Sequence, residues 1–243
     1  MELTQLAHTN IMRLNKRLVE LGFCSRRNAD KLIEEGRVRV NGNVATLGMQ
    51  VTDDDDIEID GEVIIKDDEK IILAYNKPKG VICTESNIEK NVKISDKIKE
   101  FGFDKRLFTI GRLDKDTTGL ILITNDGDLA REITNTHKDY EKEYEVRVNK
   151  PITSDFIHKM EEGVYLSELD KKTKPCKVHR FGKEEYRFSI TITQGLNRQV
   201  RRMCRELGYH VVDLKRVRIM KLKLGDLKID EYKTINKEEL GLA

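Results

Sequence analysis

The chain has 243 residues, of which 38% are hydrophobic, so wholesale disorder is excluded and one large domain or two smaller ones can form. No apolar run reaches the roughly 18 residues of a membrane span, and no basic-then-apolar start indicates a signal peptide, so neither is expected. The net charge of +2 hides local charges of +4 over residues 10–44, −9 over 52–69 and +6 over 190–221. Two basic segments with an acidic divider favour two contacts with RNA or DNA, although solvated surfaces would carry the same charges.

The cysteines and histidines show no disulfide or metal-binding pattern. No CxxC pair is present, and the five histidines are dispersed along the chain. We therefore expect reduced thiols in a cytoplasmic protein that has no metal site. The four cysteines are Cys24, Cys83, Cys176 and Cys204.

The first periodic segment predicts two helices followed by a hairpin. "RLNKRLVELG" has three leucines at helical spacing and ends on Gly22, which is a helix stop. "CSRRNADKLIEEGRV" restarts with Ser25 as N-cap and ends at Gly36. "VRVNGNVA" then alternates around Asn41-Gly42, which is a strong hairpin signal.

This arrangement resembles the S4 RNA-binding domain. The stretch "RLNKRLVELGFCSRRNADKLIEEGRVRVNG" closely follows the sequence pattern of that domain. Basic side chains on one helical face contact phosphates without reading bases, and a solvated surface is the alternative. The acidic "DDDDIEIDGE" that follows would be repelled by RNA, so we expect it to face away or to act as a spacer. The basic residues expected on the RNA-binding face are Arg13, Lys16, Arg17, Arg26, Arg27 and Lys31.

From "IILAYNKPKGVICT" onward the pattern predicts mainly strands, with helices near 95–101, 127–135, 153–162 and 197–208. The expected fold class is therefore α+β, with a small S4-like domain followed by a domain on a mixed, largely antiparallel sheet. We expect a flexible tail at 1–10, the S4-like domain at 11–61, an acidic linker at 62–69 and the second domain at 70–243.

The stretch "GRLDKDTTGLILITN" places carboxylates at the start of a buried strand. It matches the first half of an EF-hand loop, but its twelfth position is Asn125 instead of a bidentate Glu, so calcium binding is rejected. No GK[ST] follows the glycines, so a phosphate loop is rejected as well. An Asp in a shaped pocket and an Asp that caps a turn both remain open at this point.

A buried carboxylate needs an opposite charge to stay ionised. The nearest cationic cluster in the pattern is "NRQVRRMCREL", in which four arginines lie at i, i+3, i+4 and i+7 and would share one helical face. One of them can then enter a pocket while the others contact RNA. These arginines are Arg198, Arg201, Arg202 and Arg205.

Four motifs in order, "NKPKG", "GRLDKDTTGLILITNDGDL", "EKEYEV" and "GLNRQVRRM", resemble those of the RsuA/RluB/RluE/RluF group of ribosomal RNA pseudouridine synthases. With the S4-like domain, the resemblance covers roughly residues 12–235. "HKDYEKEYEVRVNKPIT" and "KTKPCKV" most resemble the RluF type, which acts on 23S rRNA. The resemblance implies conversion of a uridine to pseudouridine without a metal or other cofactor.

The resemblance also implies roles for particular residues. Asp114 matches the catalytic aspartate, Tyr144 the active-site tyrosine and Arg201 the arginine that pairs with the aspartate. Core packing is the alternative for a strand tyrosine such as Tyr144. Arg112 is expected to replace the extruded uridine or to contact a phosphate, with a surface ion pair as the alternative. Residues expected to contact RNA in this domain are Arg112, Arg198, Arg202, Arg205, Lys77 and Lys79.

The expected partner is therefore RNA, as 23S rRNA or a precursor ribosomal particle, with neither a membrane nor a small-molecule cofactor, and we expect a monomer. Three alternatives remain at this stage. They are a synthase for 16S rRNA or a tRNA loop, a catalytically silent RNA-binding assembly factor and, if the motif set is left aside, a DNA-binding domain fused to a hydrolase.

Overall fold

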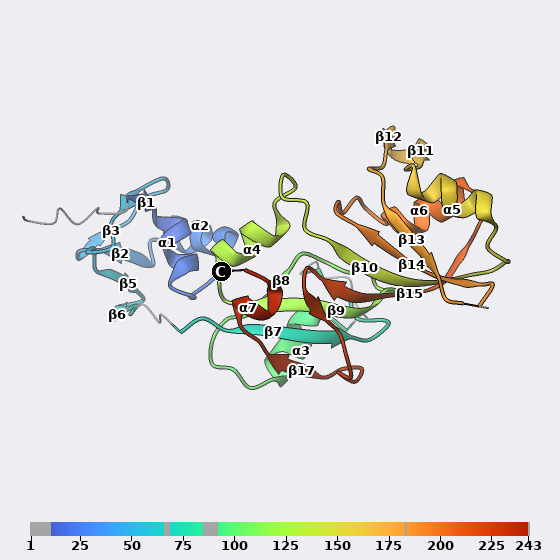
Figure 1. Cartoon of the computed structure of the whole chain (residues 1–243). Coiled ribbons are helices and arrows are strands. Elements are labelled where there is room, and N and C mark those ends of the chain that lie inside the picture. Colours follow the sequence, from blue (N-terminus) through green and yellow to red (C-terminus); the bar gives the residue numbers. More distant parts are fainter. Residues whose placement is uncertain (1–10, 66–68, 85–91, 183, 243) are drawn as a thin grey trace, which may run out of the picture. The chain divides into compact units, whose positions relative to one another are not determined.

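The computed structural model describes residues 11–65, 69–84, 92–182 and 184–242 (Figure 1). These residues form two compact units. The first contains the chain up to Lys70 together with Asp104–Arg106 and Asn125–Gly127, and the second contains the rest of the chain from Ile71 onward. The expected flexible tail at 1–10 lies outside the described residues, as do residues 66–68 of the expected linker. No helix in the described ranges is long and apolar enough to cross a bilayer.

The first unit contains the two predicted helices and the predicted hairpin. The Ser25 side chain caps the second helix by accepting a hydrogen bond from the Asn28 backbone N–H at 3.3 Å. Asn41 and Gly42 both have positive φ, as a tight hairpin turn requires. The elements are β1 (Met12–Arg13), α1 (Leu14–Glu20), α2 (Arg26–Glu34), β2 (Val38–Val40), β3 (Asn43–Val44), β4 (Gln50–Val51), β5 (Ile57–Ile59) and β6 (Glu62–Val63).

The strands of this unit form one small sheet in the order β3-β2-β5-β6, and β1 pairs separately with β4. Glu62 and Val63 pair with β5, so the beginning of the expected linker is part of this sheet. A core cluster that includes Leu14, Leu18, Ile33 and Val38 joins the helices to the strands.

The second unit is built on a nine-stranded sheet. Seven of the strands follow the order β13-β14-β10-β15-β9-β7-β17, and the other two, β16 and β8, pair with β15 and β9 respectively. The β9–β15 pair is parallel and the other pairs are antiparallel, which confirms the predicted α+β class with a mixed, largely antiparallel sheet. The strands are β7 (Ile72–Lys77), β8 (Phe108–Ile110), β9 (Thr118–Thr124), β10 (Lys142–Val148), β13 (Lys177–Arg180), β14 (Arg187–Ile192), β15 (Val211–Ile219), β16 (Leu222–Lys223) and β17 (Tyr232–Thr234).

The predicted helices of this unit are present with ends shifted by one or two residues. They are α3 (Ile94–Glu100), α4 (Gly127–Thr134), α5 (Ser154–Glu161) and α6 (Gln199–Glu206), and a short α7 (Lys237–Leu240) follows near the end of the chain. A two-stranded ribbon of β11 (Tyr165–Leu166) and β12 (Lys171–Lys172) encloses a 3₁₀ turn, η1 (Ser167–Leu169).

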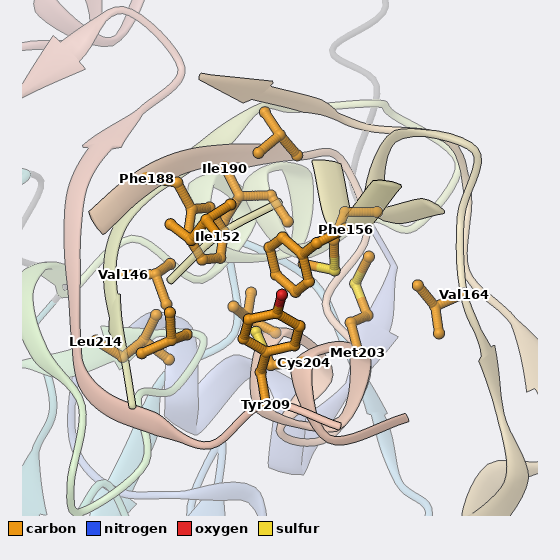
Figure 2. Packing of buried hydrophobic residues seen from close by; sticks show 14 of the residues in the cluster. Val146, Ile152, Phe156, Val164, Phe188, Ile190, Met203, Cys204, Tyr209 and Leu214 are labelled. Carbon is orange, nitrogen blue, oxygen red and sulfur yellow. The ribbon is translucent and has the colours of Figure 1, made fainter. Parts of the chain in front are cut away.

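Three apolar clusters hold the sheet. One packs α5 and α6 on the β10–β14 half, where the Phe156 ring lies between Phe188 and Tyr209 (Figure 2). On the other half, the alternate residues Leu120 and Leu122 of β9 belong to one cluster, and Ile121 and Ile123 belong to another. Because β9 is buried on both faces, its sequence is a continuous apolar run instead of an alternating one.

Candidate active site

A tight loop between β8 and β9 fixes Asp114. The carbonyl of Asp114 accepts a hydrogen bond from the Thr117 N–H at 3.1 Å, and the carbonyl of Lys115 accepts one from the Gly80 N–H at 2.8 Å. The second bond joins this loop to the "NKPKG" turn. Asp114 is half-buried, with 32% of its side chain exposed, so its carboxylate is held at the edge of the core and remains accessible.

A cavity of about 540 Å³ opens beside this loop. Its lining combines apolar walls, such as Leu113, Leu122 and Leu214, with a few polar side chains. This size and composition suit a flat organic ring held by a small number of polar contacts. The lining includes the charged or aromatic side chains of Arg112, Asp114, Lys142, Tyr144, Arg198 and Arg216.

Strand register brings three of the cavity's residues into place. Gly119 lies opposite Arg216 in the parallel β9–β15 pair, and Arg216 lies opposite Tyr144 in the antiparallel β15–β10 pair. Tyr144 and Arg216 therefore stand side by side on neighbouring strands. Asp114 lies five residues before Gly119, in the loop that leads into β9.

Arg216 is a functional candidate that sequence reasoning missed. It is 4% exposed, and its Nε donates to the Leu120 carbonyl at 2.6 Å. One terminal nitrogen lies 3.5 Å from the Tyr144 hydroxyl, and the other is buried without a hydrogen-bond partner. A buried guanidinium with an unused donor beside a cavity is prepared to bind a polar group that enters it.

Lys142 and Tyr144 share the face of β10 that lines the cavity, while Glu143 between them points to the other face and pairs with Arg218 at 2.8 Å. Lys142 donates to the Tyr140 carbonyl at 3.0 Å. Burial lowers the pKa of the Lys142 ammonium, and the nearby charge of Arg216 lowers it further. The Tyr144 ring packs against two apolar clusters at once.

The expected pairing of Arg201 with Asp114 is corrected by the structure. Arg201 donates to the Asp116 carbonyl at 2.9 Å and pairs with the Asp116 carboxylate at 3.4 Å. The ion pair of Asp114 is made with Arg198, at 3.6 Å. The reason is local backbone geometry, because Arg198 has φ +52 and leaves the helical path just before α6, so its side chain reaches the Asp114 loop.

Asp116 connects the loop to the start of α6. Burial alone would raise the pKa of its carboxyl, but the hydrogen bonds from Arg198 and the charge of Arg201 outweigh burial, and the pKa is lowered. Arg198 and Arg201 thus hold an ionised Asp116, which in turn fixes the loop that carries Asp114.

Arg201, Arg202 and Arg205 lie on α6, whereas Arg198 precedes the helix with positive φ, so the four arginines do not form the single helical face that was predicted. All four line a second hollow. Arg198 lines both hollows. Arg112 is exposed and also lines the first cavity.

The two lysines of "NKPKG" have different surroundings. Lys77 is fully buried, and its ammonium donates to the carbonyls of Pro78 at 2.9 Å and Val81 at 2.8 Å, so the prediction that it contacts RNA is wrong. Burial lowers its pKa, and its role is to close the turn. Lys79 is exposed.

In the first unit, one of the six predicted RNA contacts is also wrong. Arg17 is 6% exposed and pairs with Asp53 at 2.6 Å, because it lies on the same face of α1 as Leu14 and Leu18. Lys16 and Lys31 form helix-surface pairs with glutamates. Arg13, Arg26 and Arg27 are exposed, which leaves them accessible to a polyanion.

Both units match models of known protein families. The RNA pseudouridylate synthase family model matches residues 71–206, and the S4 domain model matches 12–57. The chain is 44% identical over 94% of its length to the dual-specificity RNA pseudouridine synthase RluF of Escherichia coli strain K12, of which it covers 77%. It is 35% identical to the ribosomal large subunit pseudouridine synthase B of Bacillus subtilis, over 94% of this chain and 93% of the relative. A crystal structure of a pseudouridylate synthase superposes with a TM-score of 0.68 at 31% identity, covering 95% of this chain and 98% of the other.

Proposed function

Because the chain belongs to the RNA pseudouridylate synthase family and carries an S4 domain, we propose that Asp114 is the catalytic carboxylate of an enzyme that isomerises uridine in 23S rRNA. In this reaction the N1–C1′ bond breaks, the uracil turns and C5 bonds to C1′. The proton on C5 is released and N1 gains one, so no net oxidation occurs.

The observation that carries this proposal is that Asp114, Tyr144 and Arg216 line one cavity. A carboxylate can attack or stabilise an electron-poor sugar carbon, as the carboxylates of glycosidases do. Asp114 attacks C1′ of the ribose, attacks C6 of the uracil, or assists glycal formation by removing a proton from the ribose. The half-exposed position of its side chain lets the ribose of an extruded uridine approach it.

Tyr144 and Arg216 act on the base. The Tyr144 ring offers a stacking surface for uracil, and its hydroxyl is the group that removes the C5 proton. Arg216 orients that hydroxyl from 3.5 Å, and its free donor is available to a uracil carbonyl.

The walls of the cavity keep the detached base from being lost. Leu113, Leu122, Leu214 and Ile219 are buried apolar residues in its lining. A dry site favours return of the base to the sugar over hydrolysis by water.

The remaining RNA contacts are assigned to basic side chains that are exposed. We assign Arg112, Lys79 and the arginines near α6 to the RNA backbone around the target, and the S4 domain to a second contact through Arg13, Arg26 and Arg27. Arg201 is a positioning residue that acts through Asp116. We propose that the enzyme acts as a monomer in the cytoplasm, where bacterial ribosomes are found.

The test measures tritium release from 23S rRNA transcripts labelled at uridine C5, since each turnover frees that hydrogen. Asp114→Asn should abolish release, whereas Asp155→Asn, an equal charge change at an exposed position of α5, should leave it unchanged. Full activity of Asp114→Asn would overturn the proposal. Parallel assays on 16S rRNA and tRNA transcripts show whether this enzyme shares the dual specificity named for its relative.

A further inference from the structure

A second hollow, of about 340 Å³, lies next to the uridine cavity. It is lined by four arginines and one glutamate, with His210 and Tyr209 completing its wall. Arg198 belongs to the linings of both hollows. A strand that places its uridine in the first cavity therefore has its backbone close to the second.

The four arginines pair with three carboxylates. Arg198 pairs with Asp114 and Asp116, Arg201 pairs with Asp116, and Arg202 and Arg205 both pair with Glu168. Glu168 thus occupies the hollow as an internal anion and compensates only one of the two charges that face it. About half of the Glu168 side chain is exposed, as is about half of the Arg205 side chain, and an ion pair between two groups this exposed is weak. The Arg202 side chain is 16% exposed, so its guanidinium needs an anion at this position, which can be Glu168 or a phosphate.

Glu168 is not required to hold its own segment. The neighbouring Ser167 donates both its backbone N–H, at 3.1 Å, and its hydroxyl, at 2.6 Å, to the Glu206 carboxylate of α6. The Tyr165 hydroxyl donates to Asp170 across the same ribbon. The Glu168 side chain can therefore turn away without releasing η1.

We propose that this hollow is a binding subsite for an RNA phosphate flanking the target uridine, and that Glu168 is a displaceable plug that fills it in the free enzyme. The inference rests on the proposed function, since it takes RNA as the ligand. A phosphate offers the same guanidinium fork several acceptor oxygens. Displacing Glu168 costs affinity for every RNA, but a strand anchored by its uridine presents the phosphate at high effective concentration. The plug therefore lowers occupancy mainly for RNA that has no uridine in the cavity, because such RNA has no second contact that compensates the cost.

The experiment compares Glu168→Gln with Glu162→Gln, which removes the same charge from an exposed position on the C-terminal end of α5. Binding to poly(A), which cannot fill the uridine cavity, and to the 23S rRNA transcript is measured over a range of KCl concentrations. Glu168→Gln should bind poly(A) about 3- to 10-fold tighter, as expected for removing one competing charge-assisted contact. The transcript displaces the same carboxylate and should gain by a similar factor, whereas Glu162→Gln should change either affinity less than twofold.

Arg205→Gln tests the opposite change, because it removes one of the arginines that would bind the phosphate. It should weaken binding and lower the salt slope by about 0.7–0.9, the value for one lost phosphate contact. The inference is overturned if Glu168→Gln binds poly(A) no tighter than Glu162→Gln, or if it melts early and loses RNA affinity, as a structural tie would. Tritium release by the same variants reports on the proposed function separately, because an active enzyme with an unaltered salt slope refutes the subsite alone.

Discussion

Replacing Gly119 with alanine should separate the two central strands of the catalytic sheet. Gly119 has φ +100, and a Cβ built on it would lie 2.2 Å from the Arg216 carbonyl oxygen and 2.8 Å from the Arg216 nitrogen. Both obstacles are backbone atoms, so no side-chain rotation relieves them. To reach ordinary contact at 3.4 Å, β9 and β15 must move apart by about 1.2 Å, the difference between 3.4 and 2.2 Å.

The loss in free energy of unfolding has two contributions. A non-glycine residue at this φ costs about 1–3 kcal/mol. The separation also lengthens the hydrogen bonds of the short β9–β15 pair beyond useful range, and each contributes about 0.5–1.5 kcal/mol net. A total of about 3–5 kcal/mol corresponds, for a chain of this size, to a drop in Tm of roughly 6–20 °C.

Calorimetry and tritium release together test this prediction. Gly225→Ala is the matched control, since Gly225 has φ +56 in the same unit and nothing lies within 4 Å of its built Cβ. It should cost about 1–2 kcal/mol from backbone strain alone. Gly119→Ala should melt well below this control and lose activity even where it is folded, because Arg216 shifts with β15. Equal melting of the two variants with retained activity would show that the strands tolerate the side chain and that the reasoning is wrong.

Three further predictions concern charged side chains. Arg216→Lys should lower kcat at least ~100-fold in the tritium assay, since an ammonium cannot reproduce the bonds to Leu120 and toward Tyr144; near-native kcat would remove Arg216 from the mechanism. Asp116→Asn should destabilise the enzyme at pH 7. Because folding lowers the pKa of Asp116, the stabilisation from its ionised carboxylate is complete above the unfolded pKa of about 3.9 and disappears as the pH falls through the folded pKa. The melting curves of mutant and wild type should therefore converge in acid and stay apart at neutral pH. In the S4 domain, Arg17→Met should alter stability and leave the salt slope of RNA binding unchanged, whereas Arg26→Gln should lower that slope by about 0.7–0.9.

Much of the fold was predictable because local patterns and burial agree. The leucine spacing of α1, the Ser25 cap and the Asn41-Gly42 turn each specify their element from adjacent residues. The apolar run of β9 predicts a strand, and its burial on both faces follows from the clusters on each side.

The errors concern charged residues that the fold buries. Arg17 lies three residues after Leu14, on the apolar face of α1, so its burial was readable from the spacing. Lys77 gave no such signal, because its partners are carbonyls of the turn that follows it. Arg216 reads as an exposed residue of a basic strand until the parallel neighbour β9 covers it.

The identity of the arginine beside Asp114 was beyond sequence reasoning for a related reason. Helical periodicity places Arg198 and Arg201 on one face, but it does not reveal that Arg198 has positive φ and points toward the loop. A motif can identify a cluster of cations, whereas the backbone conformation of one residue decides which cation reaches the carboxylate.

The position of Asp114 at the start of a buried strand now has a structural explanation. Its loop leads into β9, whose Gly119 allows β15 to approach closely, and β15 carries Arg216 directly beside Tyr144 on β10. A strand buried on both faces cannot shift without disrupting two apolar clusters, so it holds the loop before it rigidly. The apolar run therefore serves the carboxylate in two ways, because it lines the cavity with Leu122 and fixes the register that brings Asp114, Tyr144 and Arg216 to one cavity.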